Sequence, residues 1–339
     1  MVLAVTFLVL SAVIIVAAIF LAKFVDKIAE QTGMDGSIAG LVLLAGATSL
    51  PELSVGYAAI AQGAADLTAG GVLGSSLVNL LILALVDLGF RRRIFGNANT
   101  GHELSAVIGA LLTGLVLLGI VLDSELLIWR VGPISLAVVI VYFLGARLVF
   151  YQTQIQDAGD AAGPETDSDT EQESRQGQGG KSLVTLLLNI VGFLAATAVI
   201  YFVAPLLAEK GDEIALVTGL GRTFIGTLLL AGVTSLPEAV STITAVRIGA
   251  VNMAVGNIFG SNACNMLIFA VLDFATTSSL LSAVSETHAI TAACAIIVTA
   301  VALLSTLYVP RKRLWIIEPD AALIAMLVLG SLYLVFLQS

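Results

Sequence analysis

The sequence predicts an all-α membrane protein with ten transmembrane helices, arranged as two five-helix repeats of inverted topology. Three observations carry this prediction: long apolar runs, few charged residues and an internal repeat. Apolar residues make up 58% and charged residues 12% of the 339 residues, and the mean hydropathy is +1.03. Soluble domains have about 25% charged residues, so this composition indicates a chain that lies in a bilayer.

Ten apolar segments are long enough to cross the hydrocarbon core, which takes about 20 helical residues. They are residues 3–22, 38–61, 67–90, 104–122, 131–150, 183–207, 223–246, 253–275, 289–308 and 321–337. The segments are too long and too apolar for barrel strands. No basic stretch precedes the first one, which we therefore expect to be retained as a span rather than cleaved as a signal peptide.

A polar segment separates residues 1–156 from residues 183–339 and predicts a disordered linker over 157–182. Its acidic residues lack the spacing of a calcium-binding EF-hand loop. If the N-terminus is external, twelve Lys and Arg residues face the cytoplasm and three, Arg130, Lys210 and Arg222, face out. This bias predicts a multi-pass protein of the cell membrane with external termini and a cytoplasmic linker.

The two halves contain the same sequence motifs. Residues 40–87 align without gaps onto residues 226–273 at an offset of 186, with 21 identities in 48 positions. The segment GATSLPE at 46–52 becomes GVTSLPE at 232–238, and GSSLVN at 74–79 becomes GSNACN at 260–265. Because each half has five spans, equivalent helices would cross in opposite directions, as in secondary transporters whose sites lie between inverted repeats.

Glu52 and Glu238 lie near the middle of apolar spans. A charge there costs at least a few kcal/mol and usually marks an ion path. Helical spacing of three or four residues places further oxygen-bearing side chains on the faces that carry these glutamates or on the next helix. These side chains are Thr48, Ser49, Ser75 and Asn79 in the first half, and Thr234, Ser235, Ser261 and Asn265 in the second.

Prolines add backbone oxygens to this set. Pro51 and Pro237 lack an N–H for the carbonyls of Ala47 and Val233. Carboxylate, hydroxyl, amide and carbonyl oxygens suit calcium, which takes six to eight oxygens, better than magnesium, which demands strict octahedral geometry. Two histidines, His102 and His288, are too few for a zinc site, and we expect them at helix starts near the interface.

At these motifs the sequence resembles the sodium/calcium exchangers, whose paired α-repeats resemble the segments 46–52 with 74–79 and 232–238 with 260–265. The resemblance implies a ten-helix inverted-repeat fold that holds one calcium ion or about three sodium ions and works by alternating access. By position, it makes Glu52 and Glu238 the central calcium ligands. It implies added contacts from the hydroxyls of both halves and from backbone carbonyls near Ala45 and Ala231. Ala47, Val233, Ser76 and Asn265 depart from the family pattern, which affects ion preference.

A proton/calcium antiporter is the main alternative, although such relatives differ at the Thr-Ser-Leu-Pro motif. A passive cation channel is a further alternative, and saturable, counter-ion-dependent flux would separate it from an exchanger. No Ser-His or paired-aspartate constellation within the spans favours an enzyme. We expect calcium and sodium as substrates and the lipid bilayer as surroundings, with no cofactor, no nucleic acid and no obligate protein partner. Cys264 and Cys294 lie in apolar runs and predict no disulfide framework.

Replacing most of residues 157–182 with a short Gly/Ser chain should leave calcium transport largely intact. The segment has few apolar side chains with which to dock, and a flexible chain needs only to connect the two halves. Calcium flux in proteoliposomes, compared at equal protein, measures the effect. Loss of flux in a variant that folds and inserts would show that the segment does more than connect.

Overall fold

The computed structural model describes residues 2–89, 100–123, 126–128, 131–160, 183–218, 231–276, 279–307 and 319–338, and within these ranges it is helical apart from turns and an isolated bridge between Ile128 and Val131. The first half contains α1 (Val2–Thr32), α2 (Gly36–Ile38), the π-helix η1 (Ala39–Leu44), α3 (Ala45–Thr48), α4 (Leu50–Ala61), α5 (Ala65–Gly89), α6 (Thr100–Leu122) and α7 (Pro133–Asp160). The second contains α9 (Leu183–Thr218), α11 (Leu236–Arg247), α12 (Val251–Asp273), α13 (Thr287–Leu307) and α14 (Pro319–Gln338). The all-α prediction is confirmed for these residues.

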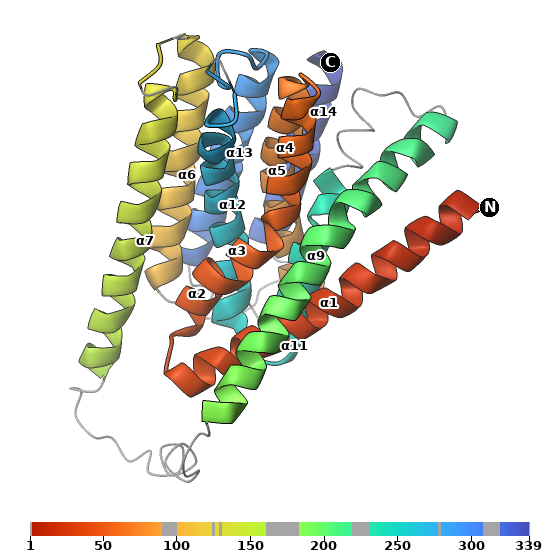
Figure 1. Ribbon diagram of the computed structural model, residues 1–339. Helices are drawn as coiled ribbons and strands as arrows, with labels where there is room; N and C mark the ends of the chain where they lie inside the picture. Colours follow the sequence, from red (N-terminus) through yellow and green to blue (C-terminus); the bar gives the residue numbers. More distant parts are fainter. Residues whose placement is uncertain are drawn as a thin grey trace.

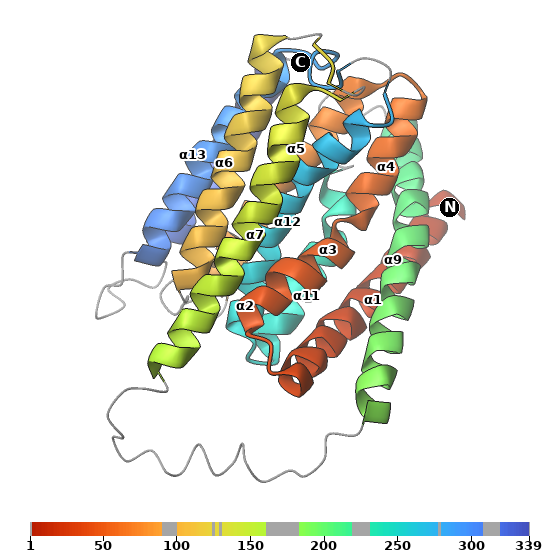
Figure 2. The ribbon, with the colours of Figure 1, turned by 60° about the vertical axis from the view of Figure 1, so that its left-hand side comes forward.

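Two long helices lie obliquely against an upright bundle. α1 and α9 run side by side in both Figure 1 and Figure 2, while α4 to α7 and α12 to α14 form the bundle. Of the most apolar 18-residue stretch of each helix, only 17% is buried in α1 and in α9, against 72% in α5 and 83% in α12. α5 and α12 therefore form the centre of the protein, and the apolar surface of α1 and α9 is left for lipid.

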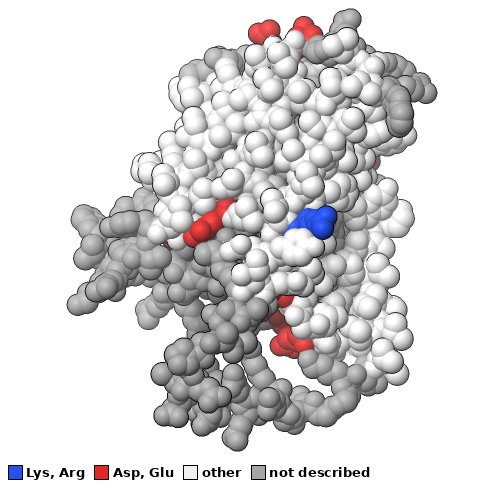
Figure 3. Space-filling view, turned by 90° about the vertical axis from the view of Figure 1, so that its left-hand side faces the viewer, with Lys and Arg blue, Asp and Glu red and all other residues white. Residues whose placement is uncertain are grey.

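The outer surface fits a bilayer. The face in Figure 3 shows few charged side chains among the described residues: acidic groups lie at the top and lower down, with an acidic and a basic patch near mid-height. Eight helices among the described residues are long and apolar enough to cross a membrane. The chain is therefore a multi-pass membrane protein by length and composition of its helices.

The remaining two predicted spans are shorter in the structure. Of the predicted span 223–246, the structure describes only residues from 231 onward, and α11 begins at Leu236. α14 has an apolar stretch of 15 residues, Ala321–Val335, where a span typically needs about 20. α7 continues to Asp160, four residues into the predicted linker, and residues 161–182 are not described. Ten spans and the linker therefore remain predictions.

The central helices α5 and α12 are antiparallel. The Asn79 side chain of α5 donates to Asn262 of α12 (3.0 Å), whereas Ser76, three residues earlier, accepts from Asn265, three residues later (3.3 Å). Residue numbers thus rise along one helix as they fall along the other. Since α5 and α12 contain equivalent segments of the repeat, equivalent elements here run in opposite directions.

Glycines let α12 approach the first half at backbone distance. A methyl group on Gly40 would overlap the carbonyl oxygen of Met253, and one on Gly256 would lie 2.6 Å from the carbonyl oxygen of Ser37. A methyl group on Gly260 would lie 2.8 Å from the Cβ atom of Ala45. Small residues allow such close helix packing in membranes, where lipid tails are as apolar as the side chains themselves.

Gly40→Ala should destabilise the purified protein, because the added methyl group has no room beside Met253. Overpacking of this kind costs about 1–3 kcal/mol, so we expect the apparent Tm in detergent to fall by several degrees. Gly330→Ala is the matched control, since a methyl group there meets nothing within 4 Å. Equal Tm values for the two variants would contradict the close packing of η1 against α12.

Candidate cation-binding site

Each glutamate of the repeat lies in the first turn of a helix that begins at a break. The break after α3 is at Ser49 (φ −84°, ψ 1°), and the equivalent break before α11 is at Ser235 (φ −80°, ψ 4°). Pro51 and Pro237 stand in the first turns of α4 and α11, where a missing N–H costs no helical hydrogen bond. The helix N-termini favour the negative charge of Glu52 and Glu238.

Every residue predicted for the site is buried, with at most 3% of its surface exposed. The set is Ala45, Thr48, Ser49, Glu52, Ser75, Asn79, Ala231, Thr234, Ser235, Glu238, Ser261 and Asn265. Within the described part of the chain, both carboxylate oxygens of Glu52 and of Glu238 lack a hydrogen-bond donor. The hydroxyls of Ser49 and Ser235 and the amide oxygens of Asn79 and Asn265 lack a partner there as well. Buried polar atoms are normally paired, so a matched set of unpaired oxygens indicates a cation site.

The hydroxyls of the two halves meet in exchanged pairs. Thr48 Oγ1 lies 3.4 Å from Ser261 Oγ, and Thr234 Oγ1 lies 3.2 Å from Ser75 Oγ. The two pairs are equivalent, because in each a threonine of one repeat meets the serine of the other. Each threonine hydroxyl also lies 3.3 Å from a backbone carbonyl, that of Ala45 or of Ala231. The structure thus brings the predicted hydroxyl and carbonyl oxygens of both halves together.

The glutamates interact across the same interface. The carboxyl group of Glu52 lies near the Ser75 and Thr234 hydroxyls, and that of Glu238 near the Thr48 and Ser49 hydroxyls, but none of these approaches has hydrogen-bond geometry. Their like charges repel each other when both are ionised. A divalent cation between them would relieve this repulsion and supply the partner that their oxygens lack.

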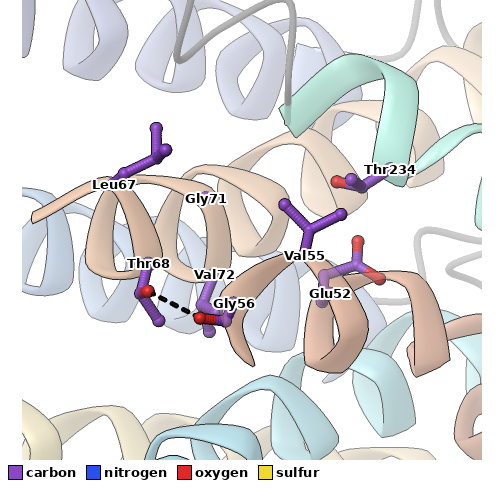
Figure 4. A pocket seen from close by; sticks show the side chains of 8 residues that line it. All are labelled: Glu52, Val55, Gly56, Leu67, Thr68, Gly71, Val72 and Thr234. Atoms are coloured by element: carbon purple, nitrogen blue, oxygen red, sulfur yellow. Dashed lines mark hydrogen bonds between the residues drawn. The ribbon is translucent and has the colours of Figure 1, made fainter. Parts of the chain in front are cut away.

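A pocket leads to Glu52 from one end of the bundle. Figure 4 shows it between α4 and α5, with Glu52 and Thr234 at one end and Leu67 at the other. Thr68 Oγ1 donates to the carbonyl oxygen of Gly56 (3.1 Å) and thereby ties α4 to α5 beside the pocket. The pocket runs from Leu67, which is 41% exposed, toward Glu52, whose carboxylate oxygens are themselves buried.

Sequence reasoning missed several buried polar side chains around the site. They are Asn257, Asn262, Ser241 and Thr242, and Ser76, which the sequence marked only as a departure from the family pattern, lies among them. Asn262 donates to the carbonyl oxygen of Ser76 (3.2 Å), and Asn257 donates to Ser241 and Thr242. Asn257 could have been found, because it precedes Ser261 and Asn265 by four and eight residues and so shares their helical face.

Cys264 and the two histidines discussed in the sequence analysis make contacts other than with the two glutamates. The Cys264 thiol contacts the Tyr142 hydroxyl (3.2 Å), in line with packing. His102 is buried at the start of α6, with Nε2 3.2 Å from Ser37 Oγ and 3.3 Å from Asn252 Oδ1. His288, at the start of α13, lies 3.6 Å from Asp66. Within the described residues no three His, Cys, Asp or Glu side chains cluster as a metal site, so the candidate site is an oxygen site with two carboxylates.

Comparisons with known proteins agree with a membrane transporter built around a cation site. The profile of the family described as sodium/calcium exchanger protein matches residues 2–151 and 188–338. The inner membrane protein YrbG of Escherichia coli (strain K12) is 32% identical over 242 residues, which cover 70% of this chain and 68% of YrbG. The sodium/calcium exchanger MaX1 of Methanosarcina acetivorans is 36% identical over 96 residues, which cover 28% of this chain and 25% of MaX1.

The fold also matches solved structures. A structure of the sodium-calcium exchanger NCX_Mj, soaked with 10 mM Na⁺ and no Ca²⁺, aligns with a TM-score of 0.69 and 18% identity over 98% of both chains. The fold and the buried oxygen site define a membrane antiporter for cations, a transporter and not an enzyme. The chain belongs to the sodium/calcium exchanger family.

Calcium should raise the apparent Tm of the purified protein, and Glu52→Gln or Glu238→Gln should each abolish this rise. The amide keeps the side-chain volume but removes half of the charge that offsets calcium. A ligand at 100 times its Kd adds about 2.7 kcal/mol of stability, which is readily measured. Glu209→Gln, at an exposed position on α9, is the matched control and should keep the full calcium effect. Retention of the calcium effect in either site variant would contradict the assignment.

Proposed function

We propose that this antiporter exchanges extracellular sodium for cytosolic calcium, or the reverse, at a single site formed by the two repeats. The observation that carries the proposal is the matched set of buried oxygens without donors on both halves. We assign Glu52 and Glu238 as the central calcium ligands. Their two negative charges offset the two positive charges of one calcium ion.

The neutral oxygens of the site are assigned to sodium. Their side chains are Thr48, Ser49, Ser75, Asn79, Thr234, Ser235, Ser261 and Asn265, together with the carbonyls of Ala45 and Ala231. Sodium needs fewer compensating charges than calcium, so hydroxyl, amide and carbonyl oxygens can hold it around a shared carboxylate pair. The duplication of the Thr-Ser pair supports several sodium positions related by the repeat.

The proposed stoichiometry is about three sodium ions for one calcium ion, which moves one net positive charge in each cycle. A membrane potential would then contribute about 2.3 kcal/mol per 100 mV to the exchange. Asn79 and Asn265 are amides where a potassium-dependent exchanger would be expected to add an acid. We therefore propose exchange without a potassium requirement.

We further propose alternating access between two inverted five-helix repeats, with ten spans and both termini external. The antiparallel pairing of α5 with α12 and the exchanged Thr–Ser contacts support the inverted repeat. The excess of Lys and Arg on one side supports the orientation. The two halves would rock against each other about the fixed site, as inverted repeats do in secondary transporters.

Sodium should drive calcium uptake without potassium. Vesicles that contain the protein are loaded with sodium and diluted into sodium-free calcium buffer, while external potassium and the pH gradient are varied. We expect uptake to need internal sodium, to be indifferent to potassium and to rise with an inside-positive potential, because net charge leaves with sodium. Glu52→Gln and Glu238→Gln should abolish uptake, and Glu209→Gln should not.

Three results would overturn parts of this proposal. Calcium uptake that persists without sodium and follows an imposed proton gradient would identify a proton/calcium antiporter instead. An absolute need for potassium would overturn the proposed ion set. Calcium flux that needs no counter-ion and does not saturate would identify a channel.

A further inference from the structure

The surroundings of the two glutamates differ, although the repeat makes them equivalent. Eight residues line the pocket at Glu52, and the offset of 186 gives each a counterpart around Glu238. The counterparts are Glu238, Ser241, Thr242, Met253, Ala254, Asn257, Ile258 and Thr48, and none is more than 1% exposed. Among the pocket residues, by contrast, Leu67 is 41% exposed and Val55 and Gly71 are partly exposed.

The difference coincides with three substitutions between the repeats. Gly71 on α5 is replaced by Asn257 on α12, Val55 by Ser241 and Gly56 by Thr242. In the first half these positions carry no side-chain polar atom. In the second half all three do, and the helices α11 and α12 face each other through them.

Asn257 connects three elements through its amide. Its Nδ2 donates to Ser241 Oγ (3.1 Å) and to Thr242 Oγ1 (2.9 Å) on α11, while its Oδ1 lies 3.4 Å from the hydroxyl of Thr48 on α3. All four side chains are buried. Opening a path to Glu238 between α11 and α12 would leave these groups without their partners, and each unpaired buried polar group costs about 1–3 kcal/mol.

The same contact affects a proposed ligand. Thr48 has one hydroxyl proton, and Asn257 offers it an acceptor besides the carbonyl of Ala45. At the equivalent Thr234 the position of Asn257 is held by Gly71, which has no side-chain acceptor to offer. The Ala45 carbonyl also accepts from the backbone N–H of Ser49 (3.0 Å), so when the Thr48 proton points to Asn257 the carbonyl keeps one lone pair for a cation.

We propose that Asn257 is a positioning residue that locks α11 to α12 and α3, and thereby closes the approach to Glu238, whereas the approach to Glu52 keeps a pocket between α4 and α5. The two approaches are held by different interactions: a network of amide and hydroxyl side chains between α11 and α12 on the Glu238 side, and the bond from the Thr68 hydroxyl to the Gly56 carbonyl between α4 and α5 on the Glu52 side. This inference rests on the proposed function of the two glutamates as one transport site. The lock would make the approach to the site harder to open on the Glu238 side than on the Glu52 side.

The test measures access to each path with a thiol reagent. The full-length protein is used with Cys264 and Cys294 replaced by alanine. Leu67→Cys then reports on the pocket at Glu52, and Met253→Cys reports on the equivalent buried region at Glu238. With N-ethylmaleimide in detergent, we expect Met253→Cys to react at least about tenfold more slowly than Leu67→Cys, because the Met253 position is 1% exposed. Adding Asn257→Ala should raise the Met253→Cys rate about tenfold, the effect of about one net hydrogen bond.

Two companion variants separate the lock from a general loss of stability. Ser241→Ala with Thr242→Val keeps Asn257 but removes its acceptors, so it should also accelerate the labelling of Met253→Cys. Gly71→Ala, where a methyl group meets nothing within 4 Å, is the matched control and should leave that rate unchanged. None of these changes should alter the Leu67→Cys rate, which a loosened fold would raise.

An unchanged Met253→Cys rate in both the Asn257 variant and the Ser241/Thr242 variant would overturn the lock. Equal acceleration by Gly71→Ala would overturn it too. Sodium-driven calcium flux, measured on the same variants, tests the proposed function separately, since labelling needs neither ion. A lock that limits access predicts that Asn257→Ala changes the apparent KM for calcium more on one side of the membrane than on the other.

Discussion

The burial of two carboxyl groups without hydrogen-bond donors is the constraint on which the rest of the structure depends. Glu52 and Glu238 lie deep in apolar helices, beside each other and among oxygens of the opposite repeat. Such a pair is costly in a bilayer unless cations compensate it. The breaks at Ser49 and Ser235, which aim two helix N-termini at these groups, and the hydroxyls gathered around them follow from this need.

The repeat meets that need with one set of residues used twice. The pairs Thr48–Ser261 and Ser75–Thr234 exchange partners between the halves, and so do the contacts of Asn79 with Asn262 and of Ser76 with Asn265. Even the histidine contacts follow this rule, because Asn252 and Asp66 are equivalent positions. Departures from the repeat are therefore informative, and Asn257 opposite Gly71 is one that contacts a proposed ligand, Thr48.

Much of this could be predicted from the sequence. Hydropathy gave the helices, and the constant offset of 186 identified the site residues, because a buried glutamate amid Thr, Ser, Pro and Asn has few structural explanations. The π-helix of η1 and the contacts of Asn257 could not be predicted, since they depend on how α12 packs against Gly40 and Gly256. The asymmetry of the two paths also needed coordinates, because exposure is a property of packing and not of residue type.

The position of the bound divalent cation shows directly whether Glu52 and Glu238 hold it together. An anomalous difference map from crystals soaked in Sr²⁺, a heavier stand-in for calcium, would locate it. The account predicts one peak between the carboxyl groups of Glu52 and Glu238, with oxygens of both repeats within about 2.3–2.7 Å, slightly beyond the calcium range for the larger ion. A peak held by one repeat alone, or one distant from both glutamates, would contradict it.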